Sequence, residues 1–180
     1  MDVKHYNQKR LRNAKFITPP NVLKAKVGYG GLSDAVLERA QNVLENNTED
    51  FRPLGELYLK QMKDGIDYVA KLGHPTNEEE DIARILFPCV QLKANGGMFH
   101  YPLITRIAER FVQFMEVVEK LDPETLDITI AFYTTLKIVI NGEIKGDGGP
   151  KGHALVEELN GACMRYFEKH NETYGNNPTS

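Results

Sequence analysis

Histidine and cysteine are the side chains of this sequence best suited to chemistry, but their spacing points to little of it. His153 and Glu157 stand four residues apart in a helical pattern, so one helix face would carry two metal ligands. The sequence has no His-Glu-x-x-His, no Cys-x-x-Cys and no calcium-loop spacing. Pairs at that spacing arise often by chance, and we expect no metal and no other cofactor.

The two cysteines, Cys89 and Cys163, both fall within amphipathic helical patterns. Nucleophilic catalysis would need a histidine beside one of them, and neither sequence context supplies it. A free cysteine in such a pattern usually behaves as a small buried apolar residue. We therefore expect no enzymatic activity, and a reduced, cytoplasmic protein fits this cysteine usage best.

Two glycine-rich segments and one acidic run suggest ligand sites at first sight. The run at 28–31 has no preceding strand and no following Lys-Ser/Thr, which a phosphate loop requires. The segment 146–152, with Lys151, would hold phosphate at a helix N-terminus, but no strand precedes it and a helical-hairpin turn is the better interpretation. The acids at 78–81 complement the positive end of a helix better than they form a metal cluster.

The composition is that of an ordinary globular domain. The 180 residues are 41% hydrophobic and 26% charged, with a net charge of -3. No apolar run approaches the roughly 18 residues of a membrane span, and the polar, basic start does not resemble a signal peptide. The basic N-terminal segment shows no regular alternation of aromatic and basic residues of the kind that nucleic-acid-binding segments have. We therefore expect one domain that binds neither membrane nor nucleic acid.

Apolar residues recur at helical spacing through most of the chain from Ser33 onward. The segment before it, 1–32, lacks a sustained period and is expected to lie across the helices as an extended arm. We predict six helices: from Ser33 to about 46, from about 48–50 to Gly73, from Thr76 or Asn77 to the glycine pair at 96–97, from 101–102 to 118, from Asp122 to 140, and from about 150 to 167. The β-branched residues near 135–140 also suit a strand, but no partner strand is present.

The stretch 86–103 is central to the prediction. Its helical half places two stripes side by side. One stripe suits a core and consists of Ile82, Ile85, Cys89, Leu92 and Gly96. The neighbouring stripe suits a rim and consists of Leu86, Val90, Lys93 and Gly97.

This stretch resembles the centre of histidine phosphotransfer (HPt) domains, which carry a phosphoryl group on one exposed histidine between a sensor kinase and a response-regulator receiver. The family motif is roughly A-H-x-(L/I)-K-G-x-(G/A), and a divergent bacterial branch continues it as G-x-F-G-Y-P-L. The matching residues are Leu92, Lys93, Gly96, Gly97, Phe99, Tyr101, Pro102 and Leu103. Val90 stands in the position of the phosphoacceptor histidine, and His100 replaces a glycine of the branch pattern. Valine has no lone pair to offer phosphorus.

The distal segment 141–159 is similar to the end of the same branch, where a G-D-G-G element joins the last two helices. The resemblance covers about 33–167. It implies an all-α fold, an antiparallel up-and-down four-helix bundle with an additional N-terminal helix and an extended N-terminal arm. The domain boundaries that follow are an arm at 1–32, an HPt-like domain at 33–170 and a disordered tail at 171–180.

The resemblance implies a non-catalytic adaptor of two-component signalling. Its binding face would be the Val90 patch, which we define as Leu86, Val90, Lys93, Ala94 and Gly97. The partner would be a receiver domain or a sensor kinase, and the chain would bind it without transferring phosphate. Two alternatives stay open: a helical bundle that forms a homodimer through the same rim, and an active phosphotransferase that uses His100. The rim stripe would also suit packing under the N-terminal arm.

Overall fold

The computed structural model describes residues 31–175, and within that range the chain is helical apart from its connections. The described helices are α2 (Asp34–Glu45), α3 (Arg52–Leu72), α4 (Glu79–Gly96), α5 (Pro102–Val117), α6 (Pro123–Asn141) and α7 (Gly149–Gly175). The all-α prediction is confirmed, and 135–140 is helical. None of these helices combines the length and the apolar character that crossing a bilayer requires.

The predicted N-terminal arm and C-terminal tail are only partly within the described residues. The arm at 1–32 lies outside the described residues except for its last two positions. Helix α7 continues to Gly175, into the segment 171–180 that is expected to be a disordered tail. Residues 176–180 lie outside the described range.

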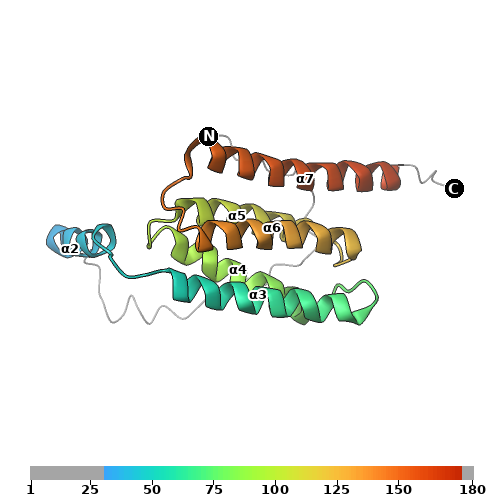
Figure 1. The fold of residues 1–180 in the computed structure, drawn as a ribbon, viewed down its shortest axis with the longest axis horizontal. Helices are drawn as coiled ribbons and strands as arrows, with labels where there is room; N and C mark the ends of the chain where they lie inside the picture. The colour runs from blue at the N-terminus through green and yellow to red at the C-terminus, as the bar shows by residue number, and fades with distance from the viewer. Residues whose placement is uncertain (1–30, 176–180) are drawn as a thin grey trace.

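Helix α5 lies at the centre of the packing, with α4, α6 and α7 against it (Figure 1). Pro102 begins the helix, where its missing N–H leaves no helical hydrogen bond unmade. The buried stripe of α5 consists of Leu103, Ile104, Ile107, Ala108, Phe111, Phe114 and Met115. Phe111 packs on Phe132 of α6, with ring centroids 5.2 Å apart. Phe114 meets Tyr166 of α7 edge-on at 5.5 Å.

Helices α3 and α4 approach each other closely at one glycine. A Cβ added to Gly65 of α3 would lie 2.7 Å from the backbone oxygen of Arg84 in α4. Pro88 lies inside α4, and because proline has no N–H, the Arg84 carbonyl lacks its helical donor. Gly65 therefore lets α3 lie directly against the part of α4 that the proline alters.

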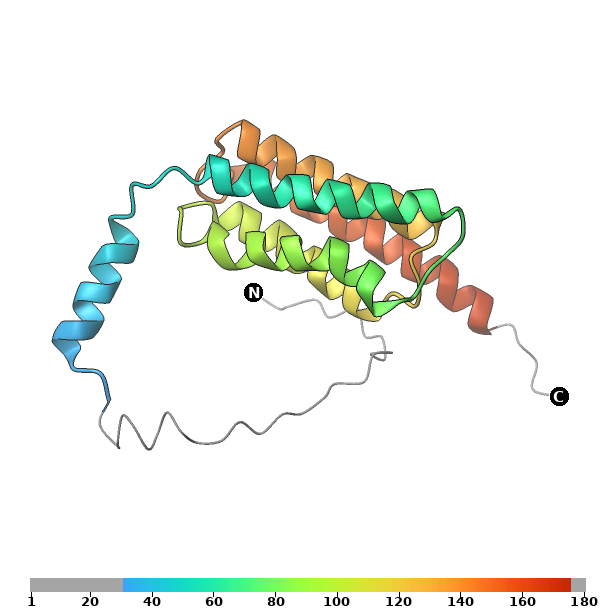
Figure 2. The ribbon, with the colours of Figure 1, turned by 90° about the horizontal axis from the view of Figure 1, so that it is seen from below.

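Hydrogen bonds join the connections at each end of the α3–α6 core. At one end, the N–H of Thr76 donates to the Leu121 carbonyl at 3.1 Å, and Leu121 donates back to Thr76 at 2.6 Å. At the other end, Gly146 donates to the His100 carbonyl at 2.8 Å, and Leu103 donates to the Gly146 carbonyl at 3.3 Å. The connection after α3 thus lies beside that after α5, and the connection after α4 beside that after α6 (Figure 2).

Helix α3 begins at Arg52, slightly later than the expected start at 48–50. The side chains of Asn47 and Asp50 each accept a hydrogen bond from the N–H two residues later, at 3.0 and 2.9 Å. Such turns hold the backbone outside the helical conformation. Pro53 lies in the first turn, as expected.

Helix α4 has Glu78 as its N-cap, rather than Thr76 or Asn77. Thr76 still organises this end, because its hydroxyl accepts the N–H of Glu78 at 3.2 Å and donates to the Asp81 carboxylate at 2.8 Å. The acids at the start of α4 therefore serve the helix terminus, in line with the sequence interpretation.

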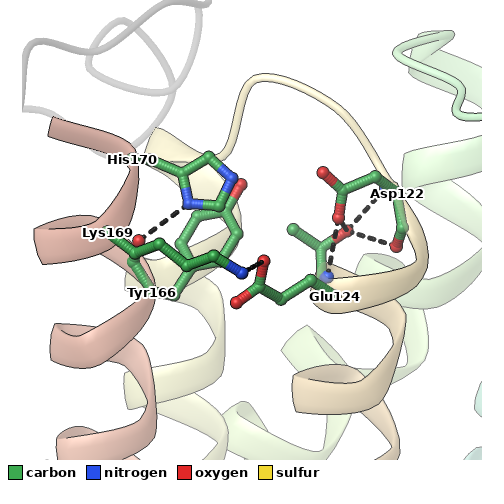
Figure 3. A network of polar contacts seen from close by, with 6 residues as sticks. Asp122, Glu124, Tyr166, Lys169 and His170 are labelled. Atoms are coloured by element: carbon green, nitrogen blue, oxygen red, sulfur yellow. Dashed lines mark hydrogen bonds and ion pairs between the residues drawn. The ribbon is translucent and has the colours of Figure 1, made fainter. Parts of the chain in front are cut away.

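The start of α6 has a capping box and is joined to the last turns of α7 by an ion pair (Figure 3). The Asp122 carboxylate accepts the N–H of Thr125 at 2.9 Å, and the Thr125 hydroxyl accepts the N–H of Asp122 at 2.7 Å. This capping box satisfies donors that the helix leaves free. Lys169 of α7 lies 2.8 Å from Glu124 of α6.

Helix α2 stands apart from the rest. It has no buried residue and makes no contact with the other described helices. Both ribbon views show it projecting from the end of the core at which α3 begins (Figures 1 and 2). Its exposed apolar side chains are Val36, Leu37, Val43 and Leu44.

Candidate functional site

The Val90 patch lies on the outer face of α4. Val90 is 38% exposed, Ala94 and Gly97 are exposed, and Leu86 is half-buried. The predicted core stripe is confirmed, because Ile82, Ile85, Cys89, Leu92 and Gly96 are all buried. Helical periodicity alone therefore separates the covered face of α4 from the face available to a partner.

Lys93 is paired rather than isolated on this face. Its Nζ lies 3.4 Å from Glu109 Oε1 of α5, with the two side chains 37% and 45% exposed. A pair this exposed adds little stability. Its effect on the patch is electrostatic, since Glu109 offsets part of the positive charge that the sequence assigns to the rim. Glu109 belongs to another helix, so no spacing within α4 could reveal it.

The two glycines at the end of α4 have different surroundings. A Cβ on Gly96 would lie 2.8 Å from the Thr105 hydroxyl and 3.0 Å from the Tyr101 carbonyl, so Gly96 permits the close approach of α5. A Cβ on Gly97 would meet only Thr105, at 3.9 Å. Gly97 is therefore the one of the pair that leaves room for an approaching backbone.

Phe87 is the surface residue that the sequence interpretation missed. It is 61% exposed and precedes Val90 by one turn on the same outer face. Phe87 also lines a groove of ≈ 460 Å³ between α3 and α4. In that groove the Arg84 guanidinium lies 4.5 Å from the ring centroid of Tyr68. The apolar surface thus extends from the Val90 patch toward α3.

His100 lies beyond the end of α4, in the turn before α5. Its φ is 65°, in the left-handed region that favours glycine. Its ring Nε2 lies 3.2 Å from the Asn47 carbonyl. A carbonyl only accepts, so Nε2 is the donor in this contact, and the lone pair of the neutral ring is on Nδ1. His100 and Val90 are not brought together.

The other candidate groups have structural surroundings. His153 Nδ1 lies 3.2 Å from the Arg106 guanidinium. His170 stacks on Tyr166, with centroids 4.1 Å apart, and its Nδ1 lies 2.8 Å from the Tyr166 carbonyl (Figure 3). No group of three or more His, Cys, Asp or Glu side chains within the described residues could hold a metal.

Both cysteines are buried, and burial raises the pKa of the Cys89 thiol far above its ordinary value. A thiol that stays protonated is a poor nucleophile. The Cys89 thiol donates to the Ala108 carbonyl, 3.8 Å from Sγ. Cys89 is therefore placed as a core residue, as its pattern predicted.

The segment 146–152 forms the turn between α6 and α7. Gly146, Gly148 and Gly149 have positive φ, and the Asp147 carboxylate accepts the Gly149 N–H at 2.9 Å. The Gly149 N–H is therefore already hydrogen-bonded to Asp147 and is not available to bind an anion. A Cβ on Gly148 would lie 2.7 Å from the Leu103 side chain, so the turn packs against the start of α5.

No family model matches the chain, and neither the curated proteins nor the solved structures contain a match to it. Function is therefore inferred from the motif residues and from the geometry of α4.

Proposed function

We propose that this chain is an HPt-like adaptor that binds a component of a two-component pathway without transferring phosphate. The α3–α6 core is, in this proposal, an antiparallel up-and-down four-helix bundle, with α7 packed on its α5 and α6 side. The alternating ends at which successive connections pair support this topology. Short connections between successive helices are typical of such bundles.

The observation that carries the proposal is the surface around Val90. An exposed valine occupies the middle of α4, at the position where the resembling family has its phosphoacceptor histidine. Lys93 follows one turn later and Gly97 one turn after that, on the same face. Lys93 and Gly97 thus match the family motif in residue type, while valine stands in place of the nucleophile.

The mechanism is occupancy. The apolar centre of the Val90 patch gains free energy by losing contact with water, and Gly97 permits close approach of the partner backbone. Lys93 provides a positive charge at the edge of the contact. A receiver domain or kinase bound here would be withheld from a phosphorylating partner.

Binding is tested by titrating receiver domains from the two-component systems of the same organism into the full chain. We expect Val90→Asp to weaken binding by roughly tenfold or more, because a carboxylate would be desolvated at the centre of the contact. Lys93→Glu should weaken it further by reversing the charge. Ile130→Asp is the matched control, since Ile130 is 44% exposed on α6. Equal affinity of the Val90→Asp and wild-type chains would refute the proposed face.

A gain-of-function variant tests the ancestry of the site. We expect Val90→His to accept an acid-labile phosphoryl group from a phosphorylated receiver, because it returns an exposed imidazole to the face that holds Lys93. The wild-type chain should take up no label. The His100→Gln variant provides the control: a wild-type label that disappears in this variant would instead identify His100 as the acceptor.

A further inference from the structure

Helix α2 exposes an apolar face that nothing in the described chain covers. Val36, Leu37, Val43 and Leu44 are between 44% and 72% exposed on a helix of 12 residues. Isolated helices shorter than about 12–15 residues are marginal in water, and most helical stability comes from packing an amphipathic face. The helical conformation of α2 therefore calls for a surface to pack on.

The link between α2 and the core is held by hydrogen bonds. The Asn47 side chain donates to the Met98 carbonyl at 3.1 Å, and the His100 ring contacts the Asn47 carbonyl at 3.2 Å. The N–H of Asn47 also bonds to the Leu44 carbonyl at 3.4 Å, which joins this anchored residue to the last turn of α2. The helix is thereby directed away from its own core, as both ribbon views show (Figures 1 and 2).

The groove between α3 and α4 offers a surface of the kind α2 needs. Phe87 and Tyr68, 61% and 42% exposed, line it from the two helices. Leu57, 49% exposed, lies one turn before the groove residue Gln61 on the same stripe of α3. A shallow apolar groove between two helices is the usual receptor for the apolar face of a third helix.

The dimensions and charges of the two surfaces agree. The 12 residues of α2 span about 18 Å, and the stripe from Leu57 to Tyr68 spans about 16 Å. At about 100° per residue, Arg39 borders the apolar face of α2 beside Val43, and Asp64 lines the groove. The positive charge at the edge of α2's apolar face thus has a negative charge available on the other surface.

We propose that α2 of one copy of this chain packs in the α3–α4 groove of a second copy, and that the second copy does the same in return. This exchange gives a two-fold symmetric dimer in which each protomer contributes both surfaces. The inference does not rest on receiver binding, because the dimer would use Tyr68 and Phe87 rather than Lys93. Phe87 nevertheless adjoins Val90 on the outer face of α4, so the two surfaces are contiguous.

The oligomeric state of the full chain tests this proposal. Light scattering across a dilution series should show a dimer that dissociates on dilution. Leu37→Glu on α2 and Phe87→Glu in the groove should each raise the dimer dissociation constant roughly tenfold or more, since each places a charge in an apolar contact. Ile138→Glu, at a 55% exposed site on α6, should leave it unchanged. Circular dichroism checks that the variants fold.

Cysteine pairing then identifies which copy supplies α2. Cys89 and Cys163 are buried and do not compete with introduced thiols. A mixture of Leu37→Cys chains with Phe87→Cys chains should form a disulfide-linked dimer of the two. A monomer at every concentration would overturn the proposal, as would a double variant that closes the disulfide within one chain while the mixture forms none. Loss of receiver binding in Val90→Asp alone bears on the proposed function and not on this dimer.

Discussion

Cys89 and Val90 are neighbours in sequence but have opposite environments. Cys89 has no exposed surface and Val90 is 38% exposed. Burial raises the pKa of the Cys89 thiol, and the charge of Lys93 opposes this only weakly. One step along the helix therefore separates a group held uncharged from a side chain available to a partner.

The raised pKa of Cys89 predicts a loss of stability in alkaline solution. In the unfolded chain the thiol ionises near its ordinary pKa of about 8.5, whereas in the folded chain it stays protonated. The contribution is therefore fully present below about pH 8.5 and declines above it, by up to about 1.4 kcal/mol per pH unit. Urea unfolding between about pH 8 and 9.5, where tyrosine is still protonated, measures the slope. Cys89→Ala should have a shallower slope, and an identical slope would contradict the assignment.

His100 carries the backbone conformation of a glycine. With φ at 65°, it costs roughly 1 kcal/mol relative to glycine, while its ring gains an exposed contact with Asn47. We expect His100→Gly to be more stable than His100→Ala by about 1 kcal/mol, because alanine keeps the strain and loses the ring. Urea unfolding of the two variants checks this, and equal stabilities would contradict it.

At the scale of helices, the contact of α3 with α4 depends on one missing side chain. Gly65→Ala would place a Cβ 2.7 Å from the Arg84 backbone oxygen, and a backbone atom cannot rotate away. We expect a net loss of about 1–2 kcal/mol, since the overpacking exceeds the gain in helix propensity. Thermal or urea unfolding measures it.

Gly161→Ala in α7 is the matched control for Gly65. Its added Cβ would meet only the end of the flexible Arg165 side chain, at 3.3 Å. This variant should gain about 0.5–1 kcal/mol from helix propensity. A Gly65→Ala variant that is stabilised as much as Gly161→Ala would show that the helices are free to separate there.

Most of the helices could be predicted from sequence because each leaves a local signal. The apolar period, Asp122 before Pro123 and Gly73 after α3 are visible without any tertiary knowledge. The starts of α3 and α4 were displaced by a few residues, because side chains such as Thr76 form turns that compete with the first helical turn.

The surface of the site was less predictable than its helix. The face of α4 that carries Val90 follows from periodicity, but the Glu109 partner of Lys93 lies on another helix. The exposure of Phe87 depends on how far α3 covers α4, and that is set by Gly65 and Pro88. Contacts between two helices, such as these, cannot be predicted from the residue spacing within one helix.

At the scale of the whole molecule, the described chain consists of a core from α3 to α7 and the separate helix α2. We expect hydrogen exchange to be slowest in α5, whose stripe is buried against three helices, and fastest in α2. Mass spectrometry at low protein concentration measures both. Protection in α2 should rise with concentration if the exchange dimer forms, while protection in α5 should not. Slow exchange in α2 under dilute conditions would mean that another surface covers it.

The hydrogen-bonded connections at both ends of the core have a consequence for recognition. With Thr76 bonded to Leu121 at one end and Gly146 to His100 at the other, α4 is prevented from sliding along its neighbours. The face around Val90 is accordingly preorganised, and binding there requires little ordering of the backbone. Calorimetry of complex formation should then yield a heat-capacity change that reflects the apolar area removed from water, with no added contribution from coupled folding.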